Sequence, residues 1–235
     1  MTPPKFPRAA RGFTLTELVI VMVIAALLIG SLILPLGAQQ DLRSYRDTQQ
    51  EMAGIVDALT GFAASHLAVD GKPYLPCPDT DNDGNEDRSS SGDCLSQEGR
   101  LPWNTLGIGR EDAWGNRYRY RVTKAYAGKT AGFSLATAGT LRVCENSACS
   151  RYVADTLPAV VVSHGKNGAG AYNAGGSTNA PPAGDDEKAN QDANNDFVSH
   201  APTQGDAPGG EFDDLVAWIS PNILASRMLG AGRLP

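Results

Sequence analysis

The chain has 235 residues, enough for one domain of ordinary size with an attached anchor segment. Its formal net charge is −6, and the acidic residues lie almost entirely in the body of the chain, which argues against non-specific DNA binding because that binding requires net positive charge. Gly (26 residues) and Pro (15 residues) are abundant, so loops are expected to form a large share of the structure.

The amino end combines positive charge with a long apolar run. Residues 1–12 contain three basic side chains and no acid, whereas Leu18–Ala38 contains no charge and residues 41–235 carry a net −8. A helix of that apolar length rises about 30 Å, enough to cross a bilayer core. The pattern predicts a single membrane span with a cytoplasmic amino terminus and an exported body.

Glu17 stands at the start of the apolar run. A carboxylate at the edge of hydrocarbon is costly to bury and usually has a partner. On these grounds alone, Glu17 either rests in the headgroup zone without a role or pairs with an unidentified cation.

The string RGFTLTELVIVMVIAALLIG resembles the amino-terminal signal of type IV prepilins and type II secretion pseudopilins. The resemblance rests on Gly12 before Phe13, on Glu17 four residues later, and on the apolar helix that follows. It implies a leader over residues 1–12, which a prepilin peptidase removes before methylating the new Phe13 amine. It also implies that Glu17 pairs with the Phe13 amine of a neighbouring subunit, and that residues 13–38 form a membrane and fibre-core helix.

Residues 39–70 are predicted to form an amphipathic helix with one buried face, because apolar side chains recur at spacings of three and four. Gly71 and Pro73 are expected to end it. Pro35, earlier in the apolar run, lies where related pilins often carry a helix-bending proline. The apolar positions are Met52, Ile55, Val56, Leu59, Phe62, Ala63 and Leu67.

Residues 71–235 are predicted to form a β-rich head. No strand–helix–strand alternation is evident, so an antiparallel sheet is expected and the fold class is α+β. The segment from Asn222 favours a short final helix, and residues 165–210, poor in large apolar side chains, favour a flexible insert. The strand candidates are Asn116–Val122, Gly132–Ala136, Thr140–Cys144, Ala159–Ser163 and Val216–Ile219.

The segment EDAWGNRYRYRV resembles a strand of the major pseudopilin of type II secretion, with Ala113 where that family often has Pro. Alternation would place three arginines on one face and two tyrosines on the other. The arginine row could bind nucleic acid, or it could pair with local acids, which the acidic body favours.

The four cysteines, Cys77, Cys94, Cys144 and Cys149, allow three disulfide pairings. The nearest-neighbour choice joins Cys77 to Cys94 and Cys144 to Cys149, and an exported head would retain such bonds. A four-cysteine zinc site competes, but the spacing lacks any C-x-x-C.

The segment CPDTDNDGNEDRSSSGDC between the first two cysteines resembles a calcium-binding loop. Gly84 stands where the loop needs a sharp turn, but Ser90 replaces the usual bidentate Glu, for which Glu86 or Asp93 could substitute. The alternative is a solvated acidic loop. The candidate ligands are Asp79, Asp81, Asp83, Asn85 and Asp87.

Major pseudopilins have a calcium site in their C-terminal loops, so the resemblance makes the region of Asp213 and Asp214 a second candidate. Its ligands cannot be assigned residue by residue.

No phosphate-binding loop, nucleophile elbow or metalloprotease helix is present, and no enzymatic activity is expected. The sequence therefore predicts a structural subunit, with a large head that favours a minor component, of a type IV pilus-like or type II secretion pseudopilus fibre. Its expected partners are a prepilin peptidase, other pilin or pseudopilin subunits, the inner-membrane assembly machinery and membrane lipid. The expected location is the bacterial inner membrane, with a periplasmic head. The alternative is a fibre-tip binding module, either an adhesin or a DNA-uptake pilin.

Overall fold

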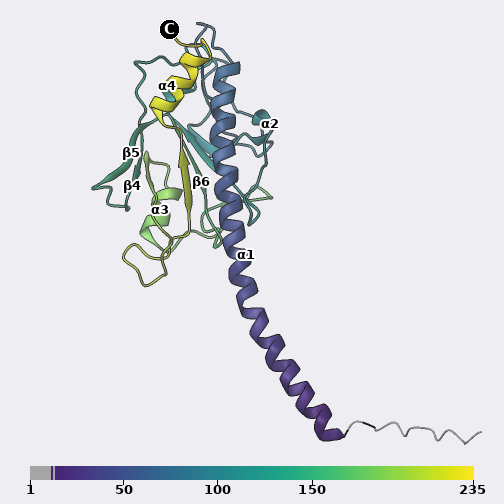
Figure 1. The fold of residues 1–235 in the computed structure, drawn as a ribbon. Helices are drawn as coiled ribbons and strands as arrows, with labels where there is room; N and C mark the ends of the chain where they lie inside the picture. The colour runs from purple at the N-terminus through teal and green to yellow at the C-terminus, as the bar shows by residue number, and fades with distance from the viewer. Residues whose placement is uncertain (1–11, 13) are drawn as a thin grey trace, which may run out of the picture. The chain divides into compact units, whose positions relative to one another are not determined.

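The computed structural model describes residue 12 and residues 14–235, apart from the side chains of residues 29–36. The predicted leader, Phe13 and the side chain of Pro35 fall outside this description. The chain divides into two compact units, at residues 1–43 and 44–235. Its helices are α1 (Leu15–Ser65), α2 (Trp103–Leu106), α3 (Asp185–Gln191) and α4 (Pro221–Gly230) (Figure 1).

The first unit consists of the front part of α1. Its apolar side chains are exposed all around the helix; for example, Met22 is 66% exposed and Leu27 is 70% exposed. Within the described part of the chain, no helix contains a stretch long and apolar enough to cross a membrane. The prediction of a membrane-spanning helix over residues 13–38 is therefore not supported by the described residues.

The second unit is built on a four-stranded antiparallel sheet in the order β1-β3-β6-β9. Tyr120 of β3 lies opposite Val161 of β6, which in turn lies opposite Ala217 of β9. The α+β class with an antiparallel sheet is thus confirmed. The strands are β1 (Glu98–Arg100), β3 (Arg119–Val122), β6 (Ala159–Ser163) and β9 (Leu215–Trp218).

The rear of α1 and the final helix α4 share one hydrophobic core with this sheet (Figure 1). Met52, Ile55 and Leu59 of α1 are almost fully buried, as the amphipathic pattern predicts. The helix ends at Ser65, five residues before the predicted limit at residue 70, and Gly71 follows in a turn with φ +77°. That left-handed conformation suits glycine.

A second sheet has the order β5-β4-β8 and packs on the other face of the first through its own apolar cluster. Its β4–β8 pair is parallel, which departs from the wholly antiparallel expectation. The predicted strand Gly132–Ala136 is wrong, because the structure has irregular backbone and a turn there. The strands are β4 (Leu141–Cys144), β5 (Tyr152–Leu157) and β8 (Asp196–Val198), with a separate pair of β2 (Asn116–Arg117) and β7 (Tyr172–Asn173).

The segment 165–210, expected to be a flexible insert, contains β7, α3 and β8. Polar groups hold it in place as well as apolar ones. Asn190 of α3 is fully buried, and its side-chain amide exchanges hydrogen bonds with the Val198 N–H (2.7 Å) and C=O (3.0 Å). The Asn190 amide thus pairs with the backbone of β8 in the way that the main chain of a neighbouring strand would.

Candidate assembly and ion-binding sites

The amino end of α1 carries a capping box. Thr14 precedes the helix, and its N–H and hydroxyl donate to Glu17 Oε2 at 2.9 and 2.8 Å. The Glu17 N–H returns a bond to the Thr14 hydroxyl at 3.3 Å. This reciprocal pattern satisfies backbone donors that would otherwise be unpaired in the first turn. It holds the Glu17 carboxylate at the helix start, immediately after Gly12, which is exposed, and Phe13, which is outside the described residues.

Both disulfides follow the nearest-neighbour arrangement. Cys77 joins Cys94, and Cys144 joins Cys149. Cys77 and Cys144 are fully buried, so each bond ties a surface loop to the core. No free cysteine remains among the described residues, and the zinc alternative is therefore wrong.

The acidic loop brings together only some of its predicted ligands. Carboxylate oxygens of Asp79, Asp81 and Asp87 lie within 4.8 Å of one another, whereas Asp83 is not in this set. Asp79 is fully buried, and burial raises the pKa of its carboxyl. Its Oδ1 accepts the Asn82 N–H at 2.6 Å, and its Oδ2 accepts the Gly84 N–H at 2.9 Å. The buried carboxylate is thus already satisfied by the backbone of its own loop.

Two other carboxylates that were expected to bind the ion, those of Asp83 and Glu86, make different bonds. Asp83 accepts the backbone N–H and the side-chain amide of Asn85, at 2.6 and 2.9 Å, and these bonds lower its pKa. Glu86 accepts the Cys77 N–H and pairs with Arg88 at 2.8 Å. Glu86 therefore braces the loop from inside and cannot replace the missing bidentate ligand.

The second acidic cluster lies between α3 and β9. One oxygen each from Glu187, Asp213 and Asp214 lie within 4.8 Å of one another. Glu187 is 2% exposed and Asp214 is 5% exposed. The sequence suggested the two aspartates, but Glu187 sits 26 positions before Asp213, inside the presumed insert, and no spacing pattern connects them.

Neutral hydrogen-bond donors satisfy only some of the oxygen atoms of these carboxylates. Glu187 Oε1 accepts the Asn167 side-chain amide at 2.9 Å and the Asp213 N–H at 3.1 Å. Asp214 Oδ2 accepts the Asn190 amide at 2.8 Å. The Oδ1 atoms of Asp213 and Asp214 are buried and accept no hydrogen bond, although His164 Nδ1 lies 3.4 Å from Asp214 Oδ1.

Burial and mutual repulsion perturb the ionisation of this acidic cluster. Burial, with the nearby Asp214 charge, raises the pKa of Glu187 to about 7. Burial likewise raises the pKa of Asp213 to about 6. Three carboxylates, of which Asp213 and Asp214 each have an unpaired buried oxygen, form a donor set that suits calcium. Bound protons are the other way to neutralise such a cluster.

The arginine row of β2 and β3 faces inward. Arg117 and Arg119 are each 4% exposed. Glu98 pairs with Arg119 and, at 2.6 Å, with Arg121. On the opposite face, the Tyr118 hydroxyl donates to Glu51 of α1 at 2.7 Å. The predicted alternation is correct, and the arginines pair with local acids and do not form an exposed binding surface.

Comparison with known proteins supports the reading of the amino end. Residues 7–33 match the family model of the prokaryotic N-terminal methylation motif. This match and a curated relative both support the resemblance of the amino end to prepilins and pseudopilins. The chain is similar to Type II secretion system protein H of Pseudomonas aeruginosa, with 43% identity over 67 residues. That alignment covers 28% of the chain and 37% of the relative, so it spans little more than a third of the relative's length. No solved structure matches the chain.

Proposed function

We propose that the protein is a structural subunit of a type IV pilus-like or type II secretion pseudopilus fibre. The observation that carries the proposal is a prepilin-type signal followed directly by a helix with apolar side chains exposed on every side. Burial of such side chains stabilises by about 25 cal/mol per Å² of apolar surface. Lipid before assembly, and the helices of neighbouring subunits afterwards, would supply that burial.

In this proposal a prepilin peptidase cleaves after Gly12 and methylates the Phe13 amine. The capping box already holds Glu17 at the helix start. Its carboxylate then pairs with the Phe13 amine of a neighbouring subunit in the apolar fibre core, where an unpaired charge would be costly. Pairing of this kind sets the axial register between subunits.

Before assembly the subunit is anchored in the bacterial inner membrane, with its amino terminus cytoplasmic and its head periplasmic. The assembly machinery then extracts it into the fibre. The large head, with two sheets and long loops, supports a minor component better than a bulk building block. The similarity to protein H supports the secretion pseudopilus as the context.

The test is co-expression of the full chain with an active prepilin peptidase, followed by intact mass and amino-terminal sequencing. Loss of residues 1–12 with N-methylated Phe13 is the expected result. Glu17→Gln is the matched variant: it should be processed normally and fail only to enter fibres. A retained leader, beside a control prepilin that is cleaved, would refute the proposal.

Calcium binding by the head is a second proposal, and the Glu187, Asp213 and Asp214 cluster is its better-supported site. The orphaned carboxylate oxygens support it there, whereas the backbone already occupies the buried carboxylate of the Asp79 loop. Thermal unfolding with and without millimolar calcium tests binding. Asp214→Asn should abolish the stabilisation while Asp81→Asn preserves it; the reverse result would assign the ion to the loop.

A DNA-uptake role is not proposed, because the arginines that suggested it are buried and paired. A fibre-tip adhesin role likewise has no described feature in its favour.

A further inference from the structure

Strand β9 leaves one edge of the main sheet open. It pairs with β6, and no other described strand pairs with it. The Ile219 N–H donates to Ala159 O, and hydrogen-bonded pairs alternate along an antiparallel ladder. Leu215 and Ala217 therefore also turn their backbone groups towards β6, while those of Val216 and Trp218 face the open edge.

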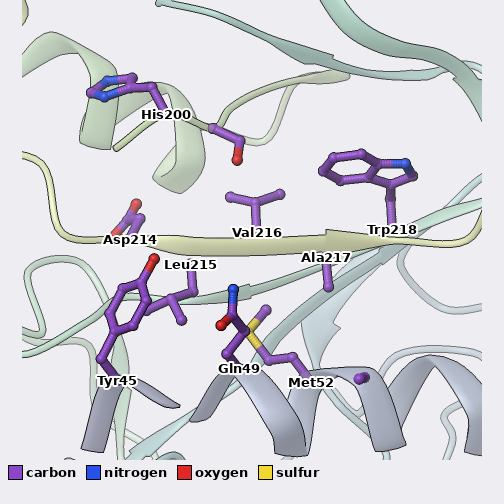
Figure 2. Close-up of a pocket in the computed structure, with 11 residues that line it drawn as sticks. Tyr45, Gln49, Met52, His200, Asp214, Leu215, Val216, Ala217 and Trp218 are labelled. Atoms are coloured by element: carbon purple, nitrogen blue, oxygen red, sulfur yellow. The ribbon is translucent and has the colours of Figure 1, made fainter. Parts of the chain in front are cut away.

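This edge lies at the bottom of a cavity of about 350 Å³. Figure 2 shows Tyr45, Gln49 and Met52 of α1 along one side and His200 along the other. The side chains of β9 alternate between the two sides: Leu215 and Ala217 point towards α1, and Val216 and Trp218 point away from it.

The chemistry of the groove selects an extended polypeptide. Outward backbone groups are satisfied by the main chain of an added strand, and flanking apolar side chains accept alternate residues of that strand. The edge lies between α1 and the residues that follow β8, and an added strand is the occupant that pairs with its outward backbone groups. A short strand suffices, since only Val216 and Trp218 offer outward backbone groups.

The chain itself contains a second strand with an unpaired edge. β5 forms the open edge of the second sheet, and its side chains are mostly exposed on both faces. Tyr152 is 52% exposed and Val153 is 49% exposed. Register shifts between β4 and β5 twist this strand, so only a short part of it can pair regularly. A short pairing is also all that β9 can accept, because only Val216 and Trp218 have outward backbone groups.

We propose that β5 of one copy of this chain adds to the β9 edge of a second copy. Donor and acceptor are different surfaces, so the contact is head-to-tail and can repeat along a fibre without closing into a dimer. The proposal deepens the fibre function proposed above and rests on it. A contact of this size is weak by itself and depends on the high local concentration produced when the subunits are held side by side.

The test uses the full chain at high density in vesicles of phosphatidylethanolamine and phosphatidylglycerol. A photo-crosslinking amino acid at Tyr152 should link to the Leu215–Trp218 peptide of a differently tagged copy. Val216→Pro removes an outward N–H without touching the β6 ladder, and Val216→Thr keeps that N–H and the branched shape. The crosslink should fall at least tenfold with Val216→Pro in the acceptor and persist with Val216→Thr.

The head-to-tail geometry supplies an internal control. A copy with both the Tyr152 crosslinker and Val216→Pro should still donate to an unmodified acceptor, which also shows that the variant folds. Equal crosslinking to both acceptors, or crosslinks only elsewhere, would overturn the proposal. If the leader is cleaved and fibres assemble but the crosslink is absent, only the β5–β9 contact is refuted. If the leader is retained, the proposed fibre function itself is refuted.

Discussion

The buried cluster of Glu187, Asp213 and Asp214 makes a quantitative prediction about pH. Folding raises the pKa of Glu187 from 4.5 to about 7, and that of Asp213 from 3.8 to about 6. A group whose pKa is raised on folding contributes stability that is complete below its unfolded pKa and is lost as pH rises through the folded value. The calcium-free protein should therefore lose stability as pH rises from about 4 to about 7.

The magnitude follows from the shift of Glu187. At about 1.4 kcal/mol per pKa unit, its contribution amounts to roughly 3 kcal/mol across this range. Asp213 adds to the loss, but the carboxylates repel one another and titrate together, so the contributions are not additive. Calcium should restore the stability at the alkaline end by mass action.

The assay is urea unfolding of the full chain in detergent micelles with EGTA, at a series of pH values. Tryptophan fluorescence reports on the head, because all three tryptophans lie after residue 100. Glu187→Gln keeps the oxygen that Asn167 and the Asp213 N–H bind but removes the charge. It should abolish most of the pH dependence and stabilise the calcium-free protein at pH 8.

The control is Asp185→Asn in the same helix, where the side chain is 75% exposed. It should leave the pH profile unchanged. Equal stability of the calcium-free protein at pH 5 and pH 8, or the same pH profile in both variants, would contradict the assigned role of Glu187.

Three further predictions concern the stability of the head, each measured by urea unfolding. Replacing Cys77 and Cys94 by Ser should cost about 3 kcal/mol, because the disulfide closes a loop with a sequence separation of 17 residues; a loss below 1 kcal/mol would contradict this. Glu98→Ala should cost about 3–5 kcal/mol, because it leaves Arg119 and Arg121 without a carboxylate partner, whereas Asp57→Ala, at an exposed ion pair, should cost under about 1 kcal/mol. Gly84→Ala should cost more than the 1–2 kcal/mol that a left-handed conformation imposes, because its Cβ would lie 2.3 Å from a tryptophan ring; a neutral effect would refute the close approach.

The sequence predicted those parts of the fold that depend on periodicity. The spacing of Met52, Ile55 and Leu59 identified the buried face of α1. Strict alternation identified the segment of β2 and β3, in which Tyr118 lies between the two strands and Tyr120 lies within β3. The prepilin signal around Glu17 was equally visible, because it is carried by consecutive residues.

Features held by polar contacts between distant segments were missed. Helix α3 has the sequence DDEKANQ, which lacks an apolar stripe, yet Glu187 and Asn190 are buried through side-chain bonds to residues elsewhere in the chain. The same contacts create the acidic cluster, so the failure to predict the helix and the failure to predict its carboxylate ligand have one cause. The strand predicted at Gly132–Ala136 does not form, because no described strand pairs with that segment.

The two units of the chain bury their apolar surface by different means. In residues 44–235, two sheets, α4 and the rear of α1 enclose apolar clusters, and two disulfides tie loops to them. In the front of α1, side chains such as Leu18 and Ile20 remain more than half exposed, and no described residue covers them. Because exposed apolar surface of this kind is stabilised only by lipid or by other protein, the head can reach its folded state first, whereas the front helix needs partners. In the proposed function, membrane insertion followed by assembly would provide those partners in sequence. Glu17 would then limit which register of helices is accepted, since any register that leaves its charge unpaired is penalised.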